Sequence, residues 1–398
     1  MSRQAAVEAA NPILIVGAGT VGLALGLRLQ QLGIENRILD RTPASPWIPP
    51  AGFDARVYAI SPSSRAFLST LGVWQSLDAQ RVGRVDAMEI HGDRRGRLHF
   101  GDTTQGQPLA HIVEHGALQA ALHARLLAHA GDRARATFSA ETLETGPRQV
   151  CLRDETGHSA SAQLLVGADG AASWVRQMLG WETTQRAYGC QGVVINLACE
   201  VGHGHCARQW FGGGEVIALL PLGGNHVSLV WSATDAHALQ LLAGDGAALV
   251  RALQARIGEP LGQLHAVSEA RAFPLSLMRV QQNARQRVVL IGDAAHGVHP
   301  LAGQGLNLGL ADAACLATVL AERGEGPDVG DASVLRRYLR RRAGPVEVMQ
   351  RTTDGLHRLF DTRNPLLGEL RNTGLDLIDR VPFLKTLLAA QAAGTLAS

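Results

Sequence analysis

The stretch Ile13-Leu14-Ile15-Val16-Gly17-Ala18-Gly19-Thr20-Val21-Gly22 decides how the N-terminal part of the chain folds. Its four leading apolar residues predict a buried parallel strand, and a helix is predicted to follow over residues 21–32. In the turn between them, Gly17 permits the tight bend, Gly19 lets phosphates approach the backbone, and Gly22 lets helix and strand pack closely. Because free N–H groups at a helix N-terminus attract phosphate, the stretch predicts a dinucleotide site.

A second strand is predicted over residues 36–40, after Gly33 ends the helix. It brings Asp40 to the same edge of the sheet as the glycine turn, where a carboxylate accepts hydrogen bonds from a ribose diol. Arg41 beside it reaches the adenosine half of a dinucleotide. A glycine turn without a ligand is the alternative, and the acidic end of the second strand argues against it.

Two further turns that contain glycine and aspartate follow apolar strands. In Val166-Gly167-Ala168-Asp169-Gly170 the turn precedes a predicted helix, although an ordinary turn and cap would look the same. After the apolar residues 288–291, Asp293 is placed to accept hydrogen bonds from sugar hydroxyls, and a loop runs through Pro300 to a glycine-rich helix start. The N-terminus of that helix would stabilise negative charge on a flavin ring. The residues at this start are Gly303, Gln304, Gly305, Leu306 and Asn307.

Composition narrows the class of protein. The net charge of +2 over 398 residues gives no electrostatic reason to expect nucleic acid as a partner. Lys385 is the only lysine, which excludes a P-loop and argues against a Schiff-base lysine in a central site. The five cysteines form no C-x-x-C pair, and His296 and His299 have no third ligand beside them in the sequence. We therefore predict no metal site and a reducing, cytoplasmic environment.

These motifs, in this order, resemble the class A flavoprotein monooxygenases typified by para-hydroxybenzoate hydroxylase. The closer resemblance is to the ubiquinone-biosynthesis hydroxylases that act on polyprenylated phenols. Its most specific part is Gly292-Asp293-Ala294-Ala295-His296, followed by residues 299–310 and Asp312. The resemblance covers nearly the whole chain, and other segments support it. They are Phe273-Pro274-Leu275, Asp54-Ala55-Arg56, Ser61-Pro62-Ser63-Ser64-Arg65, Leu71-Gly72-Val73-Trp74 and Ala218-Leu219-Leu220-Pro221-Leu222.

The resemblance implies that FAD is the cofactor and which residues bind it. Many relatives carry an arginine at the start of the helix after the first β-rich insert. This chain has Glu114-His115-Gly116 there, so His115 or Gln119 would have to replace that contact. The residues implied for the ADP half are Gly17, Gly19, Gly22, Asp40 and Arg41. The others implied are Arg56, Asp169 and Asp293, with Pro300, Gly303, Gln304, Gly305, Leu306 and Asn307 along the isoalloxazine.

The predicted fold class is α/β, with a Rossmann-type FAD-binding domain, an inserted β-sheet substrate domain and a C-terminal helical region. The FAD-binding domain is discontinuous because β-rich segments interrupt it. Its predicted ranges are residues 11–83, 109–183 and 271–345, with 84–108 and 184–270 in the substrate domain and 346–398 in the C-terminal helices. Helices are predicted over residues 61–71, 116–130, 235–257 and 304–322.

The resemblance also implies the reaction. NAD(P)H or another donor reduces the flavin, O₂ adds at C4a, and the hydroperoxide transfers oxygen to the ring of a hydrophobic phenol. No side chain must act as a nucleophile, so the catalytic candidates are Pro300 and His299 near flavin and substrate, with His226 as a second proton handler. Three alternatives stay open: a hydroxylase of a soluble aromatic substrate, a reductase of prenyl double bonds, and a non-catalytic FAD-binding scaffold in a biosynthetic complex.

The C-terminal part combines a basic cluster, Arg336-Arg337 with Arg340-Arg341-Arg342, and an apolar tail over residues 366–388. A polyprenyl substrate stays in the bilayer, so these features would suit contact with a membrane surface or a biosynthetic complex. The location would then be cytoplasmic and peripheral to the inner membrane. Amphipathic helices that pack on their own core, with a solvated arginine face, are the alternative that the pattern favours.

Overall fold

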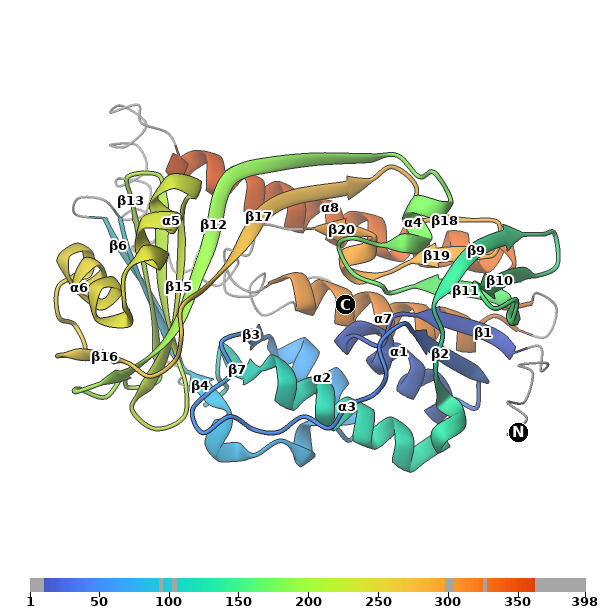
Figure 1. The fold of residues 1–398 in the computed structure, drawn as a ribbon, viewed down its shortest axis with the longest axis horizontal. Helices are drawn as coiled ribbons and strands as arrows, with labels where there is room; N and C mark the ends of the chain where they lie inside the picture. Colours follow the sequence, from blue (N-terminus) through green and yellow to red (C-terminus); the bar gives the residue numbers. More distant parts are fainter. Residues whose placement is uncertain (1–10, 93–95, 102–105, 298–303, 325–327, 362–398) are drawn as a thin grey trace.

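The computed structural model describes residues 11–92, 96–101, 106–297, 304–324 and 328–361 of the chain. Pro300, Gly303 and His299 lie outside the described residues, as does the apolar tail. Figure 1 shows two large β-sheets with helices packed around them.

The first sheet carries the N-terminal motif and has eight strands, with β1 between β11 and β2 in parallel. Ile13 and Ile15 of β1 pack into one core, and Leu14 packs into another on the opposite face. Both faces of these central strands are therefore buried, which explains their unbroken apolar sequence. The strands are β1 (Asn11–Val16), β2 (Asn36–Asp40), β8 (Arg135–Thr137), β9 (Ala140–Thr145), β10 (Val150–Asp154), β11 (Ser159–Gly167), β18 (Ala284–Arg285) and β19 (Val288–Leu290).

Helices α1, α3 and α7 pack together beside this sheet, and α8 packs against α7. Ser61 caps α2, because its Oγ accepts a hydrogen bond from the backbone N–H of Ser64. Among the described residues, one helix, α7, is both long enough and apolar enough to span a membrane. Most of it is buried against neighbouring parts of the protein. The helices are α1 (Thr20–Gln31), α2 (Pro62–Thr70), α3 (His115–Ala130), α4 (Trp174–Met178), α7 (Gln304–Ala321) and α8 (Ala332–Asp361).

The second sheet has nine strands and forms a broad wall. Its long antiparallel strands β12 and β17 run back toward the first sheet (Figure 1). β17 begins at residue 271, within the range assigned above to the FAD-binding domain, yet it pairs within the nine-stranded sheet. The domain boundaries stay a prediction. The strands are β5 (Ala87–His91), β6 (Arg97–Phe100), β12 (Thr183–Cys199), β13 (Cys206–Gly212), β14 (Glu215–Pro221), β15 (His226–Thr234), β16 (Leu264–Ala266), β17 (Arg271–Val280) and β20 (His296–Gly297).

The prediction of a continuous helix over residues 235–257 was wrong. Two helices form instead, α5 (Asp235–Ala243) and α6 (Gly246–Ile257). The Asp245 carboxylate accepts a hydrogen bond from Ala248 N at 2.7 Å, which starts a new helix directly after Gly244.

A small three-stranded sheet, in the order β3-β7-β4, links the two large ones. β3 contacts α7, and β4 contacts β14 of the nine-stranded sheet. The loop just before β3 accordingly contacts both the start of α3 and β12 of the nine-stranded sheet. The strands are β3 (Val57–Ile60), β4 (Gly83–Val85) and β7 (Ala110–Glu114), and the short 3₁₀ turns are η1 (Trp74–Ser76), η2 (Ala79–Arg81), η3 (Asp132–Ala134) and η4 (Gly292–Ala294). With parallel strands, covering helices and an inserted, largely antiparallel sheet, the α/β fold class is confirmed.

Candidate active site

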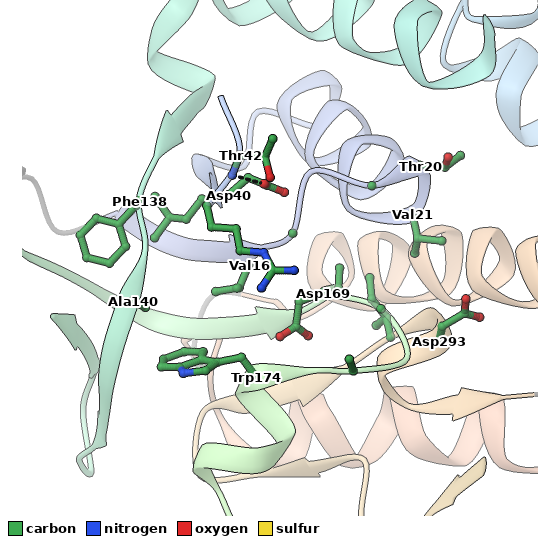
Figure 2. A pocket seen from close by; sticks show the side chains of 18 of the residues that line it. Val16, Thr20, Val21, Asp40, Thr42, Phe138, Ala140, Asp169, Trp174 and Asp293 are labelled. Carbon is green, nitrogen blue, oxygen red and sulfur yellow. Dashed lines mark hydrogen bonds between the residues drawn. The ribbon is translucent and has the colours of Figure 1, made fainter. Parts of the chain in front are cut away.

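A cavity of about 650 Å³ lies along the carboxyl ends of β1, β2, β11 and β19. Open α/β sheets bind ligands at this edge, where loops leave the strands. In Figure 2, Asp40 and Phe138 lie at one end of the cavity and Asp293 at the other. Of the predicted cofactor residues, those lining the cavity are Gly17, Gly19, Asp40, Arg41, Arg56, Asp169, Asp293, Gly305 and Leu306.

The three glycines of the first turn have different physical roles. Gly17 has φ of +109°, and a Cβ there would lie 2.5 Å from the carbonyl oxygen of Ala168. A Cβ on Gly22 would lie 2.0 Å from the carbonyl oxygen of Gly17, so the close packing of α1 on the turn requires glycine. A Cβ on Gly19 would meet no atom within 4 Å. Packing therefore explains Gly17 and Gly22, whereas Gly19 opens onto free space in the cavity wall.

Gly19→Ala is expected to weaken FAD binding by about tenfold or more while leaving the apoprotein folded, because the new methyl group occupies ligand space only. Gly22→Ala is the contrasting variant, since its methyl group overlaps the Gly17 carbonyl and should destabilise the fold itself. Titration of each apoprotein with FAD, beside its urea unfolding curve, separates the two effects. Equal FAD affinity in Gly19→Ala and the parent protein would contradict this role for Gly19.

The Asp40 carboxylate is shared between the protein and the cavity. Its Oδ2 accepts a hydrogen bond from Ala18 N at 2.6 Å, and its Oδ1 accepts one from Thr42 N at 2.8 Å. Asp40 thus holds the glycine turn in place while it lines the cavity. Gln119 supports the same turn from α3, because its Nε2 donates to the Ala18 carbonyl oxygen at 3.0 Å.

Two buried polar atoms of residues in the cavity wall, Thr20 Oγ1 and Asp169 Oδ1, have no hydrogen-bond partner among the described residues. The other oxygen of Asp169 accepts a hydrogen bond from Val175 N at 3.0 Å. Buried polar atoms normally have partners, so these two are suited to polar groups of a ligand. Together with the open space at Gly19, they show that the residues present fit a bound dinucleotide such as FAD.

A second cavity, of about 640 Å³, adjoins the first. Its wall is the inner face of the nine-stranded sheet and is mostly apolar, including Val194, Ala207, Ala218, Leu220 and Val230. Five residues line both cavities. They are Arg56, Tyr58, Asp293, Gly305 and Leu306.

The junction of the cavities combines a cation with groups whose pKa values are shifted. Burial raises the pKa of Asp293, and the nearby His296 and Arg56 offset this in part. Burial, then Arg56, lowers the pKa of His115, whereas burial raises the pKa of Tyr58. The Tyr58 hydroxyl lies 3.1 Å from His115 Nδ1, so this pair is hydrogen-bonded and uncharged near neutral pH. The geometry places His115, not Gln119, at the cavity surface.

The remaining predicted residues lie in different places. Asn307 lines the second cavity and pins β3, because its Oδ1 accepts from Ser61 N at 3.0 Å and its Nδ2 donates to the Ala59 carbonyl at 2.8 Å. Gln304 lines the second cavity as well. His226 lines neither cavity: its ring lies 3.1 Å from the Gly223 carbonyl oxygen.

Tyr58, Phe138 and Trp174 line the first cavity but were not predicted from the sequence. The sequence did contain a signal for Tyr58. It stands two residues after Arg56 at the start of a strand, and alternate residues of a strand share a face. Trp174 lies in the stretch over residues 166–176 that carries the Asp169 turn but had no predicted role, and Phe138 belongs to no motif. Among the residues that the structure describes, no cluster of three or more His, Cys, Asp and Glu side chains could hold a metal ion, and His296 is paired with Asp312 at 2.6 Å.

Several known proteins are similar to this chain in sequence and fold. The model of the FAD binding domain family matches residues 10–353. The 3-demethoxyubiquinol 3-hydroxylase of Escherichia coli K12 is 34% identical over 384 residues, covering 96% of this chain and 98% of that protein. The ubiquinone hydroxylase UbiL of Rhodospirillum rubrum is 32% identical over 389 residues, covering 96% and 90%.

Solved structures agree on the fold. HpxO of Klebsiella pneumoniae, crystallised with FAD and uric acid, is 19% identical with a TM-score of 0.75, covering 97% of both chains. The p-nitrophenol 4-monooxygenase PnpA of Pseudomonas putida is 18% identical with a TM-score of 0.76, covering 96% of both. The predicted cofactor FAD is confirmed by the family match. The chain therefore belongs to the FAD binding domain family, as an FAD-dependent monooxygenase similar to the ubiquinone hydroxylases.

Proposed function

We propose that this enzyme hydroxylates the aromatic ring of a polyprenylated phenol in ubiquinone biosynthesis. The observation that carries the proposal is the junction of the two cavities at Arg56, Tyr58 and Asp293. A cofactor bound along the first cavity would meet the apolar second cavity there, and the relatives named above are ubiquinone hydroxylases. An apolar wall suits a substrate whose ring carries a long hydrocarbon chain.

When bound, FAD supplies the activation of O₂ and the transfer of one oxygen atom. The residues of the chain bind the cofactor, orient the substrate and exclude water from the site. Asp40 and Arg41 lie at the end of the cavity suited to adenosine, and the apolar sheet face keeps water from the junction. A phenol is most reactive toward an electrophilic oxygen when its proton has left. The hydrogen-bonded pair of Tyr58 and His115 stands beside the second cavity and can hold or pass that proton. NAD(P)H is the proposed electron donor.

Deletion of the gene in its native host tests the proposal. We expect aerobic cultures to lose ubiquinone and to accumulate a prenylphenol lacking one hydroxyl group, identified by mass spectrometry. Its structure would reveal the ring position. A plasmid-borne copy should restore the quinone. Unchanged quinones in a strain that also lacks paralogous hydroxylases would reject this substrate in favour of a soluble aromatic compound or a scaffold role.

We also propose a cytoplasmic location at the inner-membrane surface, where the quinone precursors reside. Arg336 and Arg340 are exposed on α8 and suit anionic headgroups. Fractionation of the same complemented cells tests this. Recovery with membranes that is lost at high salt supports it, and recovery only in the soluble fraction at low salt opposes it.

A further inference from the structure

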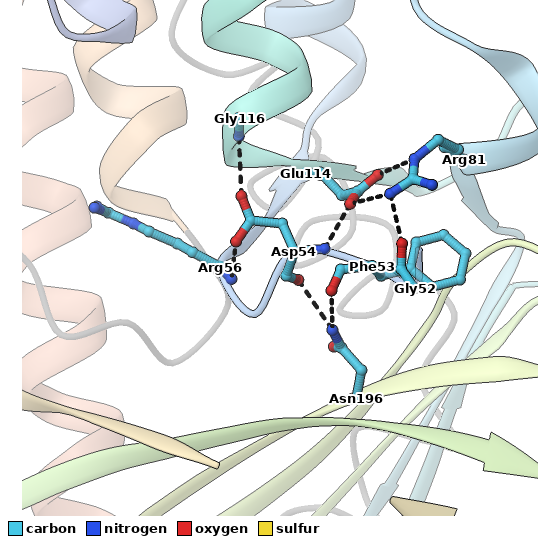
Figure 3. A network of polar contacts seen from close by, with 8 residues as sticks. All are labelled: Gly52, Phe53, Asp54, Arg56, Arg81, Glu114, Gly116 and Asn196. Atoms are coloured by element: carbon cyan, nitrogen blue, oxygen red, sulfur yellow. Dashed lines mark hydrogen bonds and ion pairs between the residues drawn. The ribbon is translucent and has the colours of Figure 1, made fainter. Parts of the chain in front are cut away.

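The loop just before β3 connects the cofactor side of the molecule to the wall of the second cavity. It runs over residues 52–56 and ends at Arg56, which lines both cavities. Figure 3 shows the Arg56 side chain pointing away from the polar network that holds this loop. The loop has no regular secondary structure, so side-chain contacts must set its position.

On the cofactor side, a buried carboxylate anchors the loop. Glu114 is 1% exposed and accepts two hydrogen bonds from Arg81, Nε to Oε2 and Nη2 to Oε1, at 2.7 Å each. Glu114 Oε1 also accepts from Asp54 N at 2.6 Å, while Arg81 Nη2 donates to the Gly52 carbonyl at 2.7 Å. A paired, buried carboxylate with several donors is a rigid anchor, because leaving any partner unmatched is costly.

Asp54 connects this anchor to Arg56 through its side-chain carboxylate. Its Oδ1 accepts from Arg56 N at 3.1 Å, and its Oδ2 accepts from Gly116 N at 3.2 Å at the start of α3. The N-cap residue of α3, Glu114, makes no side-chain cap hydrogen bond, so Asp54 supplies a cap from outside the helix. The backbone carbonyl of Arg56 in turn accepts from His115 N at 2.9 Å.

The contact from the other side is Asn196 of β12, in the nine-stranded sheet. Its side chain is fully buried, and Nδ2 donates to the carbonyl oxygens of Phe53 and Asp54, at 3.0 Å each. In Figure 3, Asn196 reaches up from the sheet to the loop. Because the amide satisfies two consecutive carbonyls, it fixes the direction of the chain immediately before Arg56.

We propose that Asn196 is a positioning residue for the cofactor site: it joins the substrate-side sheet to the 52–56 loop and so holds Arg56 at the junction of the two cavities. The residue contacts neither cavity and acts through Arg56. The inference rests on the FAD site and not on the identity of the substrate, so it survives if the proposed substrate is wrong.

A double-mutant cycle between Asn196 and Arg56 tests it. We expect Asn196→Ala to raise the dissociation constant of FAD by about tenfold in the parent protein and by less than about twofold in the Arg56→Ala background. Flavin fluorescence during titration of the apoprotein measures both constants without any need for substrate. In turnover assays on FAD-saturated enzyme, Asn196→Ala should lower kcat more than it raises KM.

Ser228→Ala is the matched control. Ser228 is the register partner of Asn196 on β15 and is equally buried, and its Oγ has no hydrogen-bond partner in the part of the chain that the structure describes. It should leave FAD affinity unchanged. Asn196→Leu keeps the branched shape of the side chain but removes the donor to both carbonyl oxygens, and it serves if Asn196→Ala does not fold because it leaves no cavity. An equal loss of FAD affinity in the parent protein and in the Arg56→Ala background, or the same loss of FAD affinity in Ser228→Ala, would overturn the proposal.

Discussion

Asp312→Ala is expected to lower the free energy of unfolding by about 3–5 kcal/mol, the typical effect of removing one partner from a buried ion pair. Asp312 is 1% exposed on α7. Its Oδ1 accepts from Arg342 Nε of α8 at 2.6 Å, and its Oδ2 lies 2.6 Å from His296 Nε2. The substitution leaves the Arg342 guanidinium buried without its counter-charge. Urea unfolding monitored by circular dichroism measures the change.

The effect should reach the cofactor as well, because Asp312 Oδ2 also accepts from Gly292 N at 2.9 Å. Gly292 begins the 3₁₀ turn that carries Asp293 into both cavities. Loss of this hydrogen bond frees the turn, so FAD affinity should fall in parallel with stability.

The pH dependence of this prediction has a definite sign. Burial alone would raise the pKa of Asp312, but His296 and Arg342 outweigh it, so the folded-state pKa lies below the usual value. A carboxyl group with a lowered pKa stabilises the fold above its unfolded-state pKa, near 3.9, and loses that contribution as the pH falls through the folded value. The stability difference between the parent protein and Asp312→Ala should therefore be full at pH 7 and shrink toward strongly acidic pH.

Glu322→Ala is the matched control, since Glu322 follows the end of α7 and pairs with Arg337 and Arg341 of the same α8. Its side chain is 47% exposed, and exposed ion pairs contribute about 0–1 kcal/mol. Similar losses in Glu322→Ala and Asp312→Ala would show that burial does not set the energy of the Asp312 cluster.

The sequence predicted those parts of the site that depend on local backbone geometry. Gly17 needs a positive φ and Gly22 needs contact with a neighbouring carbonyl, and both demands are met only by glycine. The buried strand before them was equally clear, because a strand covered on both faces has to be apolar throughout. Such features leave a mark in consecutive residues, and the fold class follows from them.

Long-range polar contacts left no such mark. Asn196 lies 142 positions from Asp54, and nothing in its neighbourhood distinguishes it from any polar residue in a strand. Asp312 belongs to a recognised motif, yet its partner Arg342 sits within a basic cluster that the sequence presents as a solvated or membrane-facing surface. Only the packing of α8 on α7 separates this one arginine, which is buried, from its exposed neighbours. The break between α5 and α6 was missed for a different reason, since Asp245 competes as a cap inside an apolar pattern that runs on beyond it.

Ala218→Phe is expected to lower kcat/KM by about 100-fold without weakening FAD binding, because the ring would occupy the second cavity and displace the substrate from the junction. Ala218 lies on β14 and lines that cavity, whereas its neighbour Ile217 faces the opposite side and packs into the core. The added phenyl group therefore projects into cavity space and should spare the core packing of the sheet. Substrate-stimulated NAD(P)H oxidation with a short-chain prenylphenol, beside FAD titration, measures the two quantities.

Ala236→Phe introduces the same side chain at an exposed position on α5, outside both cavities, and should leave both quantities unchanged. A parallel fall in FAD affinity in Ala218→Phe would mean that the cofactor itself extends along the sheet face. An unchanged kcat/KM would mean that the aromatic ring approaches the junction from elsewhere, and that the apolar wall of β14 is not part of the substrate site. The expected result, loss of turnover with FAD retained, would assign the two adjoining cavities to two different ligands.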